Sequence, residues 1–246
     1  MQLENKTAIV TGGGSGFGAG IADLFSKNGA NVIVADINIE SATDVANQVG
    51  GMPVQVDVSD AKSVESMKST VLENNTKIDI LINNAGTTHL PAPMETISEN
   101  EFDKVFEVNC KSVYLMAREF VPHFKQNKSG VILNVASTAG VSPRPNLNWY
   151  NASKGWMILA SKTMAVELAP FGIRVNVINP VAGETPLLKS FLGEDTPEMR
   201  AKFLSTIPLG RFSLPGDIAS AAMFLCSEAA SMITGASLEI DGGRTI

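Results

Sequence analysis

The residue types and spacing of Tyr150 and Lys154 suggest acid/base chemistry. They lie four residues apart in the stretch 148–160, which reads as the start of a long helix, and residues at this spacing lie one above the other on a helix face. A cation a few ångströms from a phenol favours the phenolate and lowers its pKa from about 10. The pair is therefore a candidate general acid or base. The alternative is a partly buried tyrosine beside a lysine that reaches water. Tyr114 and Arg118 have the same spacing, so a pair of this kind is a weak signal by itself.

A glycine-rich loop joins the first predicted strand, residues 7–11, to a helical pattern at Ile21, Leu24 and Phe25. Backbone NH groups at a helix N-terminus, together with the helix dipole, bind anions such as a pyrophosphate. Glycine allows the backbone to come close to such a group, whereas the alternative is merely a tight turn. Gly14-x-Gly16-x-x-Ala19 also fits the ordinary dinucleotide fingerprint, so individual glycine roles stay open. The residues expected to contact a dinucleotide here are Gly12, Ser15, Gly16, Phe17 and Gly18.

Asp36 ends the second predicted strand, residues 31–36, and lies 18 residues after Gly18. A carboxylate at this place accepts hydrogen bonds from the adenosine ribose and repels a 2′-phosphate. The next residues, Ile37 and Asn38, carry no positive charge. The pattern therefore predicts NAD rather than NADP, and the alternative is a solvated acid at a strand end.

Polar or glycine-rich residues also end the later predicted strands. In an open α/β sheet, ligands bind at the carboxyl ends of the strands, so these residues should gather at one edge. Each by itself is also compatible with an ordinary turn. They are Asp57 and Val58 after the third strand, Asn83, Asn84, Ala85 and Gly86 after the fourth, Ser137 after the fifth, and Asn179 and Pro180 after the sixth.

The elements that must position these residues alternate between strand and helix patterns. The strands are continuous apolar runs without polar alternation, which is typical of strands covered on both faces. Helices long enough to be crossovers separate them, which favours a parallel sheet with helices on both sides. The expected strands are 7–11, 31–36, 53–58, 78–83, 130–137, 174–179 and 237–240, and the expected helices include 39–49, 61–73, 99–125 and 217–226.

We therefore predict an α/β fold: one doubly wound parallel sheet of about seven strands in a single domain over residues 1–246. The stretch 181–214 is rich in Gly, Pro and Thr and interrupts the alternation. Irregular stretches of this length in a compact domain are commonly binding loops. We expect 181–214 to cover the substrate.

Composition limits the possible partners. The 246 residues are 44% hydrophobic and 18% charged, with a net charge of −6, which suits a globular protein with a large core. No basic run suggests nucleic acid, and no apolar run is long enough for a membrane span. Cys110 and Cys226 form neither a disulfide framework nor a metal site. Together with an N-terminus that lacks a secretory pattern, these observations predict a cytoplasmic protein with a small-molecule substrate and no metal.

The ordered set of motifs resembles the classical short-chain dehydrogenase/reductase family over essentially the whole chain. The set runs from Thr11-Gly12-x-x-x-Gly16-x-Gly18 through Asp57, Asn83-Asn84-Ala85-Gly86, Asn109, Ser137, Tyr150-x-x-x-Lys154 and Asn179-Pro180 to Asp241-Gly242-Gly243. The resemblance implies a Rossmann fold and a nicotinamide cofactor. It also implies a homotetramer, or at least a dimer, formed through the helices that carry Asn109 and Tyr150.

The resemblance also implies residue roles. Tyr150 would be the catalytic acid/base, Ser137 would polarise the substrate oxygen, and Lys154 would bind the nicotinamide ribose and lower the pKa of Tyr150. Asn109 would hold a water in a proton relay. The remaining cofactor contacts would come from Asp57, Val58, Asn84, Ala85, Gly86, Pro180, Val181 and Thr185, in addition to the glycine loop, Asp36 and Ile37.

One residue departs from the family pattern, and the substrate stays open. The family usually has Pro-Gly after the sixth strand, whereas this chain has Pro180-Val181, and valine adds bulk beside the nicotinamide. Candidate substrate residues are Arg144, Asn148, Trp149 and Leu187. Arg144 would grip a carboxylate or phosphate, or simply cap its loop.

Three functions are compatible with these residues. The first is an NAD-dependent dehydrogenase of a secondary alcohol, polyol, sugar or hydroxysteroid-like substrate, which Asp36 favours. The second is a 3-oxoacyl-thioester (acyl-carrier-protein) reductase, which would need a basic patch for an acidic carrier. The third is a regulatory protein that binds NAD without turnover, and the complete set of Ser137, Tyr150 and Lys154 argues against it.

Overall fold

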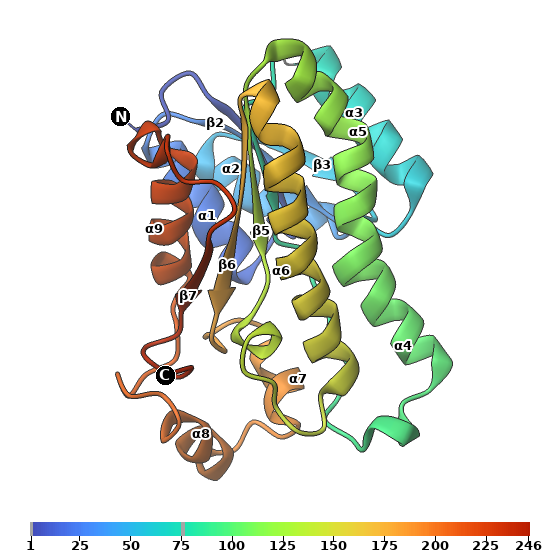
Figure 1. The fold of residues 1–246 in the computed structure, drawn as a ribbon, viewed down its shortest axis with the longest axis vertical. Helices are drawn as coiled ribbons and strands as arrows, with labels where there is room; N and C mark the ends of the chain where they lie inside the picture. Colours follow the sequence, from blue (N-terminus) through green and yellow to red (C-terminus); the bar gives the residue numbers. More distant parts are fainter. Residues whose placement is uncertain (1, 75–76) are drawn as a thin grey trace.

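The computed structural model describes residues 2–74 and 77–246, and its centre is a seven-stranded parallel sheet in the order β3-β2-β1-β4-β5-β6-β7. Helices cover both faces of this sheet (Figure 1), so the predicted doubly wound α/β fold is confirmed. The strands are β1 (Thr7–Thr11), β2 (Asn31–Asp36), β3 (Met52–Gln55), β4 (Ile80–Asn83), β5 (Gly130–Val135), β6 (Ile173–Pro180) and β7 (Ser237–Ile240). The helices are α1 (Gly16–Lys27), α2 (Ile39–Val49), α3 (Ala61–Asn74), α4 (Glu99–Phe106), α5 (Ser112–Asn127), α6 (Asn148–Leu168), α7 (Leu188–Leu192), α8 (Pro197–Leu204) and α9 (Pro215–Cys226).

Alternate residues of each strand enter two different cores. In β1, Ala8 and Val10 pack with α1, α2 and α9, whereas Ile9 packs on the opposite side with residues of α3, α5 and α6. Successive side chains of a strand point to opposite faces, so a strand that is covered on both sides must be apolar at every position. This is why the strands read as continuous apolar runs.

The strand order changes direction beside β1. This strand pairs with β2 on one side and with β4 on the other, so the connections that follow β1 and β4 leave the sheet in opposite directions. Such a switch point opens a crevice at the carboxyl ends of the strands, where ligands of open α/β sheets bind. The glycine loop leaves β1 at this point.

Several predicted boundaries are wrong in detail. Strand β3 ends at Gln55 and β5 at Val135, so Asp57, Val58 and Ser137 lie in the loops just after the strands. The predicted helix 99–125 is divided into α4 and α5 by a π-helical turn at Glu107–Lys111. Insertion of a π turn displaces the residues around it, and such turns are frequent at functional sites.

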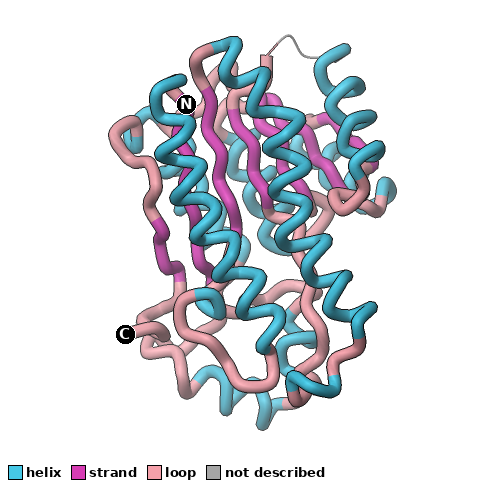
Figure 2. Tube along the Cα trace, turned by 45° about the vertical axis from the view of Figure 1, so that its right-hand side comes forward, coloured by secondary structure: helices cyan, strands magenta, loops and turns pink. Residues whose placement is uncertain are grey.

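The 181–214 segment lies beyond the carboxyl ends of the strands, together with the C-terminus (Figures 1 and 2). It contains the short helices α7 and α8, and a bridge between Gly183 and Ser213 closes it at its base. Its apolar side chains form their own small core, made of Val181, Leu188, Leu192, Phe203, Ile207 and Phe212. No helix within the described ranges is both long and apolar enough to cross a membrane.

Candidate active site

A cavity of about 570 Å³ lies at the carboxyl ends of the strands, between the glycine loop and the 181–214 segment. It contains most of the residues that the sequence nominated. Those that line it are Gly12, Ser15, Gly16, Phe17, Asp36, Ile37, Asp57, Val58, Asn84, Ala85, Gly86, Ser137, Arg144, Tyr150, Lys154, Pro180, Val181, Thr185 and Leu187. Gly18, Asn109, Asn148 and Trp149 do not line it.

The glycine loop has the conformation and the close contacts that its composition predicts. Gly12 and Gly16 have φ values of 62° and 52°, in the left-handed region that favours glycine. A Cβ atom at Gly12 would lie 3.0 Å from Cα of Ala85. Gly18 belongs to α1 and packs against the carbonyl oxygen of Gly12. Gly18 therefore contributes close packing of α1 against the loop, whereas Gly12 and Gly16 face the cavity.

Asn84 connects the end of β4 to the glycine loop. Its Nδ2 atom donates to the carbonyl oxygens of Thr11 at 2.8 Å and Gly12 at 3.2 Å, and its backbone NH donates to Oγ1 of Thr11 at 3.0 Å. These bonds hold two loops that are about 70 residues apart in the chain. Asn84 therefore shapes the cavity, in addition to lining it.

Asp36 and Asp57 are the two acids that line the cavity. Asp36 accepts from the backbone NH of Gly14 at 2.9 Å through Oδ2 and from that of Asn38 at 3.0 Å through Oδ1. A carboxylate has about four acceptor positions, so both oxygens keep capacity for a ligand hydroxyl. The bonds to the glycine loop and to the start of α2 fix the carboxylate at the edge of the cavity.

Asn109 is completely buried in the π turn and forms three hydrogen bonds. Its Oδ1 accepts from the NH of Thr87, and its Nδ2 donates to the carbonyl oxygen of Thr87 and to Oγ of Ser153, each at 2.9 Å. Both Nδ2 hydrogens are therefore used within the protein. The side chain positions the loop after β4 against α6. A relay water would have to bind to the second lone pair of Oδ1 or to the backbone of Asn109.

Tyr150, Lys154 and Ser137 meet at the inner wall of the cavity. Tyr150 and Lys154 are each 4% exposed, and the Lys154 Nζ lies 5.9 Å from the centre of the Tyr150 ring. The ammonium donates to the carbonyl oxygen of Val135 at 3.0 Å. The two side chains therefore lie close together, as their spacing on the helix predicts.

Burial shifts the pKa values of both groups of this pair. Burial raises the pKa of Tyr150 to about 12, and only partial opposition comes from a hydrogen bond with Ser137 and from the charge of Arg144. Burial also lowers the pKa of Lys154 to about 8. Removal from water disfavours the charged form of both groups. Desolvation therefore dominates the pKa of Tyr150 in this structure, and a lowering of that pKa by Lys154 stays a prediction.

The substrate side of the cavity is formed largely by the 181–214 segment. The ring of Phe191 packs edge-on against Tyr150, with the ring centres 5.1 Å apart. Val181, which replaces the usual family glycine, is 3% exposed and belongs to the core of this segment. Its side chain therefore helps to anchor the segment over the cavity as well as lining it.

Two predicted substrate residues, Asn148 and Trp149, face elsewhere. The Trp149 indole donates to the carbonyl oxygen of Met94 at 3.2 Å and packs against Phe102. Asn148 is exposed and borders a separate, shallower hollow. The first turn of α6 rotates these positions away from Tyr150, which explains the wrong prediction.

Sequence reasoning also missed Arg244, which lines the cavity. Its only signal in the sequence was its place after Asp241-Gly242-Gly243.

The residues of the cavity fit a nicotinamide dinucleotide. Gly12 and Gly16 have no side chains, so their backbone at the N-terminus of α1 is accessible. This arrangement suits a pyrophosphate. The Asp36 carboxylate stands where an adenosine ribose would reach it. Thr185 lies against Gly16: a Cβ atom added to Gly16 would be 3.1 Å from the Cβ atom of Thr185. No group of three or more His, Cys, Asp or Glu side chains in residues 2–74 and 77–246 is arranged to hold a metal ion.

Comparison with known proteins gives a consistent result. Residues 12–245 match a family model described as enoyl-(acyl carrier protein) reductase. A 4-formylbenzenesulfonate dehydrogenase of Comamonas testosteroni is 48% identical, and the match covers all of both chains. An NAD-dependent glycerol dehydrogenase of Listeria innocua is 38% identical, with all of this chain and 96% of the relative covered. The crystal structure of a 3-ketoacyl-(acyl-carrier-protein) reductase from Brucella melitensis, complexed with NADH, superimposes with a TM-score of 0.95 at 49% identity, covering 99% of this chain and 100% of that one.

Proposed function

Because the chain belongs to the short-chain dehydrogenase/reductase family of oxidoreductases, we propose that it transfers a hydride between NAD and a carbon that bears the substrate oxygen. The observation that carries this proposal is the meeting of Tyr150, Ser137 and Lys154 in one cavity with the glycine loop. The substrate is a secondary alcohol in the oxidising direction and a ketone in the reducing one.

Each residue has a defined task in this reaction. NAD, when bound, supplies the acceptor or donor of the hydride. Tyr150 takes the hydroxyl proton when an alcohol is oxidised and returns it when a ketone is reduced. Ser137 donates a hydrogen bond to the oxygen on which charge builds. Lys154 provides a buried cation one helical turn from the phenol, which favours the phenolate during proton transfer.

Asp36 supports NAD as the cofactor. Its carboxylate lines the cavity and carries a free acceptor capacity for ribose hydroxyls. A 2′-phosphate placed there would meet this negative charge, and the neighbouring Ile37 is uncharged. The glycerol dehydrogenase relative is named as NAD-dependent, which agrees with this preference.

A second candidate is reduction of 3-oxoacyl thioesters on an acyl carrier protein. Its support is the similar Brucella melitensis structure, which is described as a 3-ketoacyl-(acyl-carrier-protein) reductase. An acidic carrier protein requires a basic docking surface, whereas this chain has a net charge of −6. We therefore rank this activity second, and NAD binding without turnover third, because the three catalytic side chains are all present.

We infer further that the protein assembles as a homotetramer, or at least a dimer, and works in the cytoplasm. Large apolar side chains on the exposed side of α6, such as Leu159 and Val166, support association. Cys110 and Cys226 are free and buried, which is compatible with a reducing compartment.

The test is a panel of secondary alcohols, sugars, ketones, 4-formylbenzenesulfonate and a 3-oxoacyl thioester, followed by NADH absorbance and repeated with NADP. Tyr150→Phe should lower turnover of the best substrate by at least about 10³-fold, since it removes the acid/base group. Calorimetry should give nearly the same NAD affinity for this variant and the wild type. Normal turnover by Tyr150→Phe would overturn the mechanism.

A further inference from the structure

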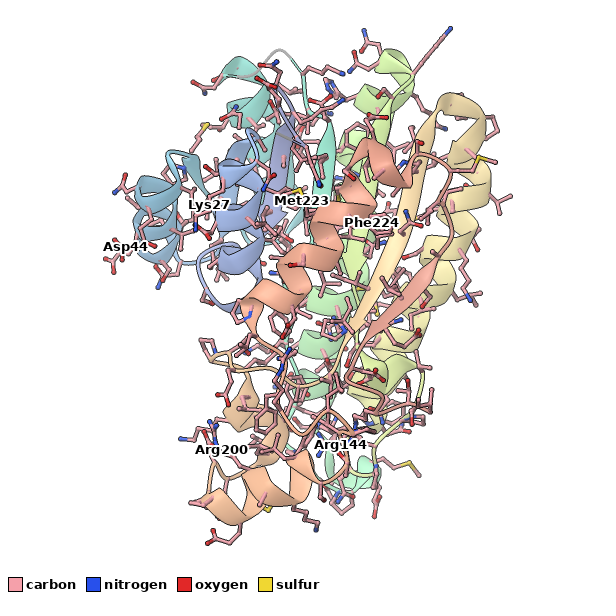
Figure 3. The ribbon with its side chains drawn as sticks, turned by 90° about the vertical axis from the view of Figure 1, so that its left-hand side faces the viewer. Lys27, Asp44, Arg144, Arg200, Met223 and Phe224 are labelled. Carbon is pink, nitrogen blue, oxygen red and sulfur yellow. The ribbon has the colours of Figure 1, made fainter. Side chains whose placement is uncertain are left out.

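Two arginines from distant parts of the chain flank one aromatic ring on the substrate side of the cavity. The guanidinium carbon of Arg144 lies 4.6 Å from the centre of the Phe203 ring, and that of Arg244 lies 4.8 Å from the same centre. All three residues line the cavity that contains Tyr150. Figure 3 labels Arg144 in the part of the molecule below the sheet, where the 181–214 segment lies.

Local structure holds both arginines in place. Nδ2 of Asn151 donates to the carbonyl oxygen of Arg144 at 2.7 Å. Gly242 and Gly243 have φ values of 63° and 88°, which turn the chain after β7 so that Arg244 comes back toward Phe203. Glycine is the residue that adopts two such values in succession without strain.

Neither guanidinium has a carboxylate partner within residues 2–74 and 77–246. Arg244 donates to Oγ1 of Thr206. Asp241 is the acid whose charge acts on Arg244, but its two oxygens already accept from Gly243 and from Thr245. A guanidinium carries five N–H donors, so the two arginines together keep several donors for a ligand.

Two adjacent cations in a partly buried place are unfavourable by themselves. Burial lowers the pKa of both guanidiniums, and the charge of Arg244 lowers that of Arg144 further. A bound anion would relieve both effects, because it would replace lost hydration with charge-assisted hydrogen bonds. The two acids of the cavity, Asp36 and Asp57, belong to its cofactor side.

We propose that Arg144 and Arg244 together bind an acid group, a carboxylate or sulfonate, on the part of the substrate that is remote from the reacting carbon. The inference rests on the proposed dehydrogenase function and names its substrate class: a small ketone or secondary alcohol with an acid group. Apolar side chains such as Phe191, Leu187 and Val181 line the same cavity. They favour an aromatic or short aliphatic spacer between the two polar ends.

The test compares two substrates with the same reacting ketone, namely 4-acetylbenzoate and its uncharged methyl ester. For the wild type, kcat/KM should be about 10- to 100-fold higher for the acid, because hydrogen bonds to charged groups are worth roughly 1.5–3 kcal/mol. In Arg144→Met and in Arg244→Met this preference should fall to near unity. Turnover of the ester can change as well, because both arginines line the cavity and the charge of Arg144 acts on Tyr150, so the readout is the ratio of the two kcat/KM values within each variant.

Arg200→Met is the matched control. Arg200 belongs to α8, packs on Phe212 at 5.7 Å and pairs with Asp195 and Glu184, but it does not line the cavity. Figure 3 places it at the outer edge of the molecule. This variant should keep the full preference for the acid. An equal loss in Arg200→Met would attribute the effect to the 181–214 segment as a whole and would overturn the proposal.

A binding measurement separates this inference from the proposed function. Calorimetry with benzenesulfonate and the protein–NADH complex should detect binding that weakens about 10-fold or more in either cavity variant and persists in Arg200→Met. Arginine-dependent binding without turnover of any substrate would support the anion site and reject the function. Turnover of the acid and the ester at equal rates in the wild type would support the function and reject the anion site.

Discussion

At the scale of the residue, burial decides how the proposed catalytic groups, Tyr150 and Lys154, behave. Tyr150 and Lys154 are placed together by helical spacing, yet their pKa values are about 12 and about 8 because both are removed from water. The neutral form of Tyr150 is therefore favoured, whereas Lys154 keeps its proton below about pH 8 and loses it above. A ligand beside them changes the free energy of charging either one, so proton transfer and ligand binding are coupled at this site.

Lys154 makes stability depend on pH in a defined window. Its pKa is about 8 in the folded protein and 10.5 ordinarily, so between these values the unfolded chain holds the proton and the folded protein does not. Stability from this group therefore rises with pH across the window. The quantity to compare is the free energy of unfolding of Lys154→Met minus that of the wild type. This difference should be larger below pH 8 than above pH 10.5, by up to a few kcal/mol.

Denaturant unfolding without added NAD, followed at several pH values, checks this expectation. The lost hydrogen bond to Val135 shifts the variant by an amount that does not vary with pH, so the slope of the difference is what matters. A difference that is the same at every pH would mean that Lys154 is not desolvated as the structure indicates.

Asp36 should set the cofactor preference. Removal of its carboxylate in Asp36→Ala removes the ribose acceptor and the repulsion of a 2′-phosphate, so the ratio of kcat/KM with NAD to that with NADP should fall about 10- to 100-fold. Glu40→Ala, an exposed acid in the first turn of α2, is the control and should leave the ratio unchanged. An unchanged ratio in Asp36→Ala would remove the basis for NAD preference.

At the scale of the element, the π turn at Glu107–Lys111 matters because it brings Asn109 into contact with two other segments. Asn109 joins the loop at Thr87 to Ser153 on α6, and Ser153 in turn donates to the carbonyl oxygen of Tyr150 at 2.7 Å. Gly86 lies between Asn109 and Lys154. A Cβ atom added to Gly86 would be 3.4 Å from Oδ1 of Asn109 and 3.4 Å from Nζ of Lys154. The turn therefore supports the catalytic face of α6 from behind.

Asn109→Ala should affect both stability and catalysis. It leaves the backbone NH and carbonyl groups of half-buried Thr87 without partners, which costs roughly 3 kcal/mol. It also loosens α6 beneath Tyr150, so kcat should fall about 10-fold or more. Asn176→Ala is a matched control: Asn176 is equally buried and bonds to Ile233 and Ala236, away from the cavity. It should lose stability to a similar degree but keep kcat, measured with the same substrate. Equal kcat values for the two variants would exclude a positioning role for Asn109.

At the scale of the whole molecule, one face of the sheet is covered by helices that keep large apolar side chains exposed to solvent. Helices α5 and α6 lie side by side on one face (Figure 1), and large apolar side chains remain exposed along them. Leu159 is 69% and Val166 77% exposed. Large exposed apolar side chains gathered on one face mark protein–protein contact, and we propose that a second copy of the chain covers them with closed symmetry.

The double variant Leu159→Glu, Val166→Glu should therefore reduce the oligomer to a smaller species in sedimentation experiments, because burial of two carboxylates in an apolar interface is costly. Met94→Glu, which places a charge on an exposed methionine outside α5 and α6, should leave the sedimentation coefficient unchanged. A wild-type monomer, or a double variant that assembles normally, would contradict this assignment of the interface.

The sequence by itself determined the features that depend on local spacing. The continuous apolar strands follow from two-sided burial, and the glycine loop, Asp36 and the Tyr150–Lys154 pair each lie within one strand–loop–helix unit or one helical turn. Local conformation specifies these relations directly, which is why the fold and most lining residues of the cavity were predicted.

Only the tertiary structure decided the rest, because those relations join residues that are far apart in the chain. The contact of Arg144 and Arg244 with Phe203 depends on how the 181–214 segment and the C-terminus fold over the sheet. The rotation of Trp149 away from the cavity depends on where Phe102 and Met94 lie. The pKa of Tyr150 depends on burial to which Phe191 contributes, and desolvation is a property of the packed molecule that no spacing of residues reveals.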